Sequence, residues 1–80
     1  MQMTGKEAMR YAMSEKQMTQ QKVANLAGYA RQTNVSEILR SDNARVDNLV
    51  RILNACGFDL VMVDRKHPEK REVITAQDGK

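Results

Sequence analysis

The segment from Val46 to Gly57 carries the most regular hydrophobic pattern in the chain, and it constrains the fold more than any other feature. Its apolar side chains recur at the three- and four-residue spacing that places them on one face of an α-helix. A glycine follows the last of them, where a left-handed residue commonly ends a helix. The pattern therefore predicts an amphipathic helix whose apolar positions are Val46, Leu49, Val50, Ile52, Leu53 and Cys56.

Three shorter segments upstream have the same helical period. Residues 4–16 carry Ala8, Met9, Ala12 and Met13 at helical spacing. Thr19 is a favourable N-cap for a second helix, with apolar positions 23, 24, 26 and 27, and Gly28 is placed to end it. A third helix is predicted over residues 32–40, because three apolar residues form an i, i+3, i+4 set: Val35, Ile38 and Leu39.

The character of the chain changes after Gly57. The short apolar run 58–63 predicts a β-strand, residues 65–71 form a charged turn, and residues 72–75 predict a second strand. An isolated two-stranded hairpin is marginal in water, and the first strand has apolar residues on both faces. A second copy of the chain would cover it. We therefore expect a homodimer formed through Phe58, Leu60, Val61, Met62 and Val63, with Val73 and Ile74 as further candidates.

Length and composition narrow the possible functions. Eighty residues allow one domain with little room for an enclosed substrate cavity, and the net charge of +3 is mildly favourable for a polyanionic partner. The single cysteine, Cys56, excludes an intrachain disulfide and a cysteine-cluster zinc site. No apolar run approaches the ~20 residues of a membrane span, and the first residues lack a signal peptide's apolar stretch. We expect a cytoplasmic protein that is not an enzyme and needs neither cofactor nor metal.

The segments combine into a mainly α-helical fold. The sequence predicts a four- to five-helix domain over residues 1–57, a C-terminal strand or hairpin over 58–75, and a flexible tail over 76–80. The small residues Ala24 and Ala27 allow the second helix to be crossed closely by another. A close pair of helices with a tight connection, the later one polar outside, is the arrangement of a helix-turn-helix motif.

Residues Thr19, Gln20, Val23, Ala24 and Gly28 match the opening pattern of the Cro and phage-repressor helix-turn-helix family. Over roughly residues 9–57 the chain resembles this family, which also places apolar residues like those at 35, 38, 46, 49 and 52. The resemblance implies a sequence-specific transcriptional regulator, normally a repressor, that reads a pseudo-palindromic operator through the major groove as a homodimer.

The chain departs from the family pattern at two points. It has one residue more than the usual spacing between Gly28 and Val35, which shifts the start of the recognition helix. Leu39 stands where the family often has an acidic residue paired with an arginine of the first helix. Arg10 is therefore expected to lie outside such a buried pair.

The resemblance also implies which side chains meet double-stranded DNA. Amide, hydroxyl and carboxylate groups on the recognition helix can pair with base edges in the major groove. Basic and short polar groups around it can neutralise or bind phosphates. The base contacts implied are Gln32, Thr33, Asn34, Ser36 and Glu37. The backbone contacts implied are Thr19, Gln20, Lys22, Arg31, Arg40, Asn43 and Arg45.

Two alternatives remain open from the sequence. The protein can be an antitoxin whose helical domain binds its own operator while the segment from Asp64 binds a toxin. It can also be a helix-turn-helix fold that serves only as a protein-interaction module, in which case it would not bind random DNA even at low salt. An RNA-binding role is less favoured, because the stacking aromatic residues expected for RNA are missing.

Overall fold

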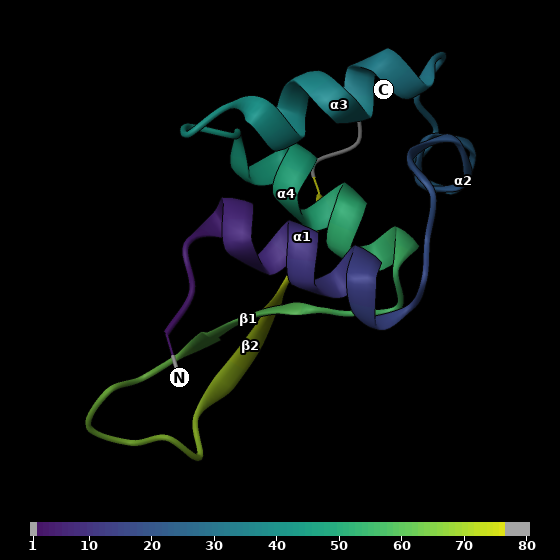
Figure 1. The fold of residues 1–80 in the computed structure, drawn as a ribbon. Coiled ribbons are helices and arrows are strands. Elements are labelled where there is room, and N and C mark those ends of the chain that lie inside the picture. The colour runs from purple at the N-terminus through teal and green to yellow at the C-terminus, as the bar shows by residue number, and fades with distance from the viewer. Residues whose placement is uncertain (1, 77–80) are drawn as a thin grey trace.

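The computed structural model describes residues 2–76, which form four helices followed by a two-stranded antiparallel hairpin (Figure 1). This confirms the mainly helical fold with a C-terminal β element. The expected tail over residues 76–80 falls, apart from Ala76, outside the described residues. No helix in the described part is long and apolar enough to cross a membrane. The helices are α1 (Gly5–Glu15), α2 (Gln20–Ala27), α3 (Gln32–Arg40) and α4 (Val46–Ala55), and the strands are β1 (Leu60–Val63) and β2 (Arg71–Ile74).

Side-chain caps begin α1 and α2. The Thr4 hydroxyl accepts a hydrogen bond from the Glu7 N–H at 3.1 Å, and the Glu7 carboxylate accepts one from the Thr4 N–H at 2.9 Å. This reciprocal pair satisfies donors that the first helical turn leaves without partners. The Thr19 hydroxyl likewise accepts from the Lys22 N–H at 3.1 Å. Thr19 is therefore confirmed as the N-cap of the second helix.

Left-handed residues end three of the helices. Gly28 closes α2 at φ 84°, and Gly57 follows α4 at φ 83°. The N–H of Phe58 donates to the carbonyl of Leu53 at 2.9 Å, which satisfies a carbonyl that the last turn of α4 would otherwise leave open. At the end of α1 the left-handed position is taken by Gln17, at φ 53°.

The strands of the hairpin begin at different residues from those predicted. The first strand was expected from Phe58 but starts at Leu60, because the Phe58 N–H is used in the cap of α4. The second strand starts at Arg71, one residue earlier than expected. The antiparallel register pairs Leu60 with Ile74 and continues to Val63 and Arg71.

All four helices contribute to one core. Its buried members are Met9 and Ala12 of α1, Val23 and Ala24 of α2, Val35 and Leu39 of α3, and Ile52, Leu53 and Cys56 after them in the chain. Two residues of the predicted apolar sets are largely in solvent, since Leu26 is 60% exposed and Val46 is 57% exposed. Short helices with neighbours on one side bury only a narrow stripe, which leaves such flanking positions in solvent.

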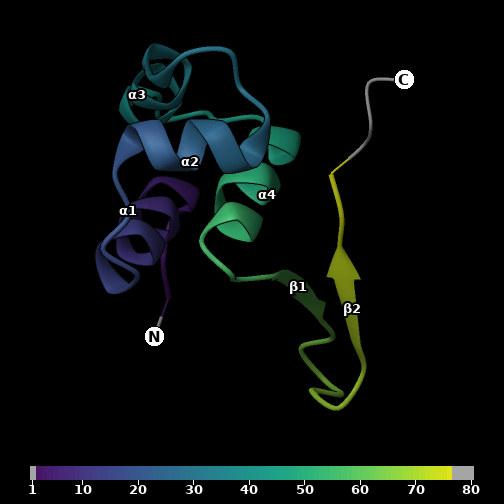
Figure 2. The same cartoon turned by 90° about the vertical axis from the view of Figure 1, so that its right-hand side faces the viewer.

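The arrangement separates α3 from the hairpin. In both views α3 lies at one end of the molecule and the hairpin at the other, with α1 and α4 between them (Figures 1 and 2). The helix α3 packs most extensively against α2 and less against α1. The polar face of α3 and the apolar surface of the hairpin are therefore distinct regions of the protein.

Candidate nucleic-acid interface

The outer face of α3 carries the side chains expected to meet bases. Val35 and Leu39 are buried, and this orients the helix with its polar residues outward. Gln32, Thr33 and Glu37 are exposed. Amide, hydroxyl and carboxylate groups in this setting can pair with base edges. The remaining two expected residues, Asn34 and Ser36, are half-buried.

The side chains of Asn34 and Ser36 already make local hydrogen bonds at the start of α3. The Asn34 side-chain oxygen accepts from the Arg31 N–H at 3.0 Å, which stabilises the first turn of the helix. The Ser36 hydroxyl donates to the Thr33 carbonyl at 3.1 Å. Base contact by either group competes with these local bonds. Among the five expected residues, Gln32, Thr33 and Glu37 are thus the more accessible.

The residues expected at the DNA backbone surround α3 in sequence and lie on several elements. Thr19, Gln20 and Lys22 stand at the start of α2, where Gln20 is half-buried and the other two are exposed. Arg31 and Arg40 flank the two ends of α3, and both are exposed. Asn43 and Arg45 are exposed residues of the connection between α3 and α4.

A groove of about 370 Å³ brings some of these residues together. It is lined by Asn34, Glu37 and Ile38 of α3, by Ser41, Asn43, Ala44 and Arg45 of the following connection, and by Tyr29 and Asn48. Two expected base contacts therefore share a surface with two expected backbone contacts. The expected residues of α2, together with Arg31 and Arg40, lie outside this groove.

The C-terminal end of α3 is held by two cations of α1, which sequence reasoning missed. Arg10 was expected to lie outside a buried ion pair, and its guanidinium donates to a backbone carbonyl, that of Leu39, at 3.1 Å. The Lys6 ammonium lies 3.4 Å from the Arg40 carbonyl and 3.2 Å from an Asp42 carboxylate oxygen. Positive charge at a helix C-terminus is stabilising. The sequence signal for this contact was the i, i+4 spacing of Lys6 and Arg10, which places both cations on one face of α1.

The N-terminal side of α3 is connected to α4 by Tyr29, another contact that sequence reasoning missed. The Tyr29 hydroxyl donates to the Asn48 side-chain oxygen at 2.7 Å. Burial raises the pKa of Tyr29, and the nearby Arg51 opposes this effect. The hydroxyl therefore remains a protonated donor at neutral pH. No periodic pattern links positions 29 and 48, so the sequence carried no signal for this pair.

The residues expected at a dimer interface divide into two groups. Phe58 and Leu60 are half-buried and pack against their own core. The Phe58 ring lies 6.3 Å from the Tyr11 ring, and the Lys16 ammonium lies 5.2 Å from its centroid. The next three residues are exposed, with Val61 at 37%, Met62 at 59% and Val63 at 43%. The free apolar surface of β1 is thus narrower than expected. On β2, Val73 is 57% exposed and Ile74 is half-buried.

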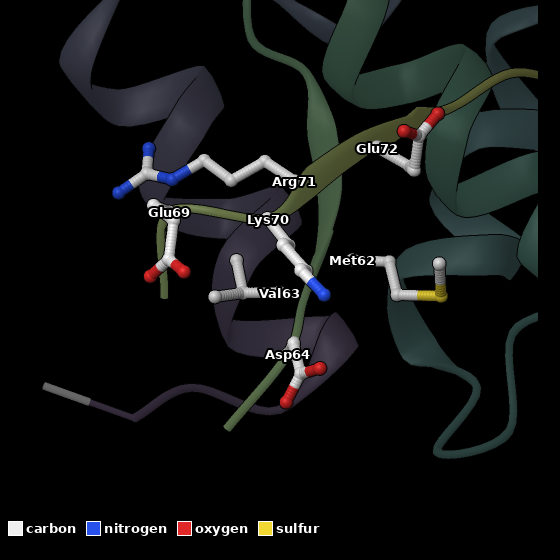
Figure 3. Close-up of a pocket in the computed structure, with 7 residues that line it drawn as sticks. All are labelled: Met62, Val63, Asp64, Glu69, Lys70, Arg71 and Glu72. Carbon is white, nitrogen blue, oxygen red and sulfur yellow. The ribbon is translucent and has the colours of Figure 1, made fainter. Parts of the chain in front are cut away.

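A shallow hollow of about 700 Å³ lies on the hairpin near its turn (Figure 3). Its lining includes the apolar Met62 and Val63, and the charged Asp64, Glu69, Lys70, Arg71 and Glu72. These side chains point in different directions rather than toward one centre (Figure 3). Within residues 2–76 no group of three or more His, Cys, Asp or Glu residues is placed to hold a metal ion.

Cys56 is 3% exposed at the end of α4, as its place on the apolar face predicted. Burial raises the pKa of its thiol, and the neighbouring Lys16 opposes this effect. A thiol that is buried and protonated at neutral pH is a poor nucleophile.

Comparison of the chain with protein-family models, curated proteins and solved structures finds no match.

Proposed function

We propose that this protein is a sequence-specific DNA-binding transcriptional regulator, a cytoplasmic repressor that reads a pseudo-palindromic operator through the major groove. The observation that carries the proposal is the pair α2 and α3. Thr19 caps α2, Gly28 turns the chain, and α3 packs on α2 with Gln32, Thr33 and Glu37 exposed. A bracing helix followed by a reading helix with short polar groups is the helix-turn-helix arrangement.

The charges around α3 support a nucleic-acid partner. Exposed cations stand before α3 at Arg31, at its end at Arg40, and in the next connection at Arg45, with Lys22 on α2. Such groups neutralise phosphates and release counterions, which is the sequence-independent part of DNA affinity. The chain as a whole has a net charge of +3. Glu37 is the exception, and an acidic group here needs a base amine such as that of cytosine.

A homodimer is part of the proposal, because one short recognition helix offers little specificity. Discrimination of ~10³ or more over random DNA normally needs two half-sites. The hairpin offers exposed apolar side chains at Val61, Met62 and Val63, away from α3 (Figure 2). The nearby hollow carries both acidic and basic side chains, and such a surface can pair with itself about a two-fold axis.

Selection of bound sequences from a random duplex pool tests the proposal most directly. We expect the wild-type protein to enrich one motif with two inverted half-sites about one helical turn apart. A single unrepeated motif would contradict the dimer alone. Failure to enrich any motif, together with no binding to random DNA at low salt, would contradict DNA binding altogether.

Gln32→Ala separates base reading from phosphate binding. The substitution should weaken binding to the selected duplex by about 1–3 kcal/mol and leave binding to a scrambled duplex nearly unchanged, since an amide reads bases. Arg45→Ala is the matched comparison. It should weaken binding to both duplexes and flatten the dependence on salt. Equal losses on both duplexes for Gln32→Ala would show that α3 does not read sequence.

The exposed hairpin also favours a second candidate function, binding of a protein partner such as a toxin. The described part of the segment from Asp64, residues 64–76, includes the turn and second strand of a hairpin that projects away from the helices (Figure 2). This surface remains accessible when α3 is occupied. A toxin encoded in the adjacent gene, bound stoichiometrically by the wild-type chain but not by a chain truncated before Asp64, would support this function.

A further inference from the structure

The position of α3 relative to α4 depends on few contacts. The helix packs against α2 and, to a lesser extent, α1, while the side facing α4 borders a groove. Residues Asn34, Glu37 and Ile38 of α3 line one part of that groove, and Asn48 of α4 lines another. A hollow on this side leaves room for α3 to shift unless something spans it.

Tyr29 connects the two parts. It lies next to Gly28 in the four-residue connection between α2 and α3, and it lines the same groove. Its side chain packs against the core, and its hydroxyl bonds to the Asn48 oxygen at 2.7 Å. Only two residues separate Tyr29 from the first residue of α3. A tether so close to Gln32 limits how far the start of the helix can move.

We propose that Tyr29 and Asn48 are a positioning pair, which holds the start of α3 against α4 so that its side chains meet base edges in register. This inference rests on the proposed function. Hydrogen bonds to bases tolerate changes of only a few tenths of an ångström in the donor–acceptor distance, so a small shift of α3 weakens contacts to specific bases. Contacts of flexible basic side chains to phosphates adapt to such a shift. Loss of the pair therefore lowers discrimination between sequences more than it lowers affinity for DNA in general.

Tyr29→Phe tests the pair while retaining the aromatic ring. The probes are the duplex enriched by the wild-type protein from a random pool and a scrambled duplex of equal length. The temperature is one at which denaturation curves show every variant folded. Affinity for the enriched duplex should fall about fivefold, the equivalent of one hydrogen bond, and affinity for the scrambled duplex should change less than about twofold.

Variants of the acceptor supply a second test. Asn48→Ala should also reduce the ratio of the two affinities, and the double variant should lower it no further than Tyr29→Phe does alone, because the Tyr29 hydroxyl also contacts Arg51. Asn48→Asp keeps an acceptor oxygen, and its added negative charge affects both duplexes, so the ratio should be retained. Tyr11→Phe is the matched control, because that hydroxyl bonds to Glu15 on α1 at 3.1 Å. It should leave the ratio unchanged.

The outcomes distinguish the inference from the function on which it rests. An unchanged ratio in Tyr29→Phe, with a wild-type protein that does enrich a motif, overturns the positioning pair alone. Additive losses in the double variant also overturn it, because the two groups would then act separately. A wild-type protein that enriches no motif overturns the proposed function and the inference with it.

Discussion

Gln17 is the residue whose backbone conformation fits its side chain least well. It is the only non-glycine residue with a positive φ within residues 2–76, at 53°. The Gln17 N–H donates to the Ser14 carbonyl at 3.2 Å, and the next N–H, of Met18, donates to the Met13 carbonyl at 2.9 Å. This is the same helix ending that Gly57 provides after α4. The hydrogen bonds of the cap hold Gln17 in a conformation that costs an L-residue about 1–2 kcal/mol.

Gln17→Gly should therefore stabilise the protein. Glycine relieves the left-handed strain, although its greater freedom in the unfolded chain offsets part of the gain. We expect the free energy of unfolding to rise by about 0.5–1 kcal/mol, measured by urea denaturation. Gln21→Gly, within α2, is the control and should lower it by about 0.5–1 kcal/mol. A loss of stability in Gln17→Gly would contradict this account of the α1 ending.

Among the elements, α3 depends most on side chains from another helix. Arg10 of α1 bonds to the Leu39 carbonyl, in the last turn of α3, where the helix leaves carbonyls without partners within the helix. Lys6 adds a contact to the Arg40 carbonyl and an ion pair with Asp42. The two positive charges also interact favourably with the negative C-terminal end of the α3 helix dipole.

Arg10→Met should lower the free energy of unfolding by about 1–2 kcal/mol, because a charge-assisted hydrogen bond is lost while the side-chain length is retained. Lys6→Met should cost less, since its carboxylate partner is 87% exposed and such pairs contribute about 0–1 kcal/mol. Thermal and urea denaturation of both variants measure the difference. Arg65→Met, in the exposed hairpin turn, is the control for loss of a surface charge. Wild-type stability in Arg10→Met would show that the Leu39 contact does not hold α3.

In the molecule as a whole, the hairpin is the region with the most exposed apolar side chains. Among residues 2–76 its two strands pair only with each other, and Val61, Met62, Val63 and Val73 are exposed. An uncovered apolar strand edge invites pairing with another chain. The proposed homodimer covers this surface while leaving α3 free, because α1 and α4 separate the two regions (Figure 1).

Val61→Lys should weaken the proposed dimer by at least about tenfold, because it places a charge without a partner in the interface. Sedimentation equilibrium from low to high micromolar concentration measures the dissociation constant. The control is Leu26→Lys, which changes an apolar residue that is 60% exposed on α2. It should leave the association unchanged. A wild-type protein that is monomeric throughout this range, with or without DNA, would rule out the dimer.

Local chemistry explains why much of the fold could be predicted from the sequence. The helices follow from three- and four-residue apolar spacing, and their ends follow from caps such as Thr19 and turns such as Gly28. Each signal depends on residues a few positions apart, and these interact in any compact fold. The exposed polar face of α3 follows equally directly, because Val35 and Leu39 orient it. That this face reads DNA bases stays a prediction, which the binding experiments with Gln32→Ala test.

Tertiary structure alone decided the contacts between elements. Arg10 and Leu39 are 29 positions apart, and Tyr29 and Asn48 are 19 apart, so no local pattern pairs them. Phe58 is a residue type that favours strands. Its N–H nevertheless donates to the Leu53 carbonyl at the end of α4, and its ring packs beside Tyr11 of α1. Local sequence patterns predicted where the helices form and most of the side chains that they bury. Which side chains hold those helices together depended on packing, because only the assembled core brings distant groups within hydrogen-bonding distance.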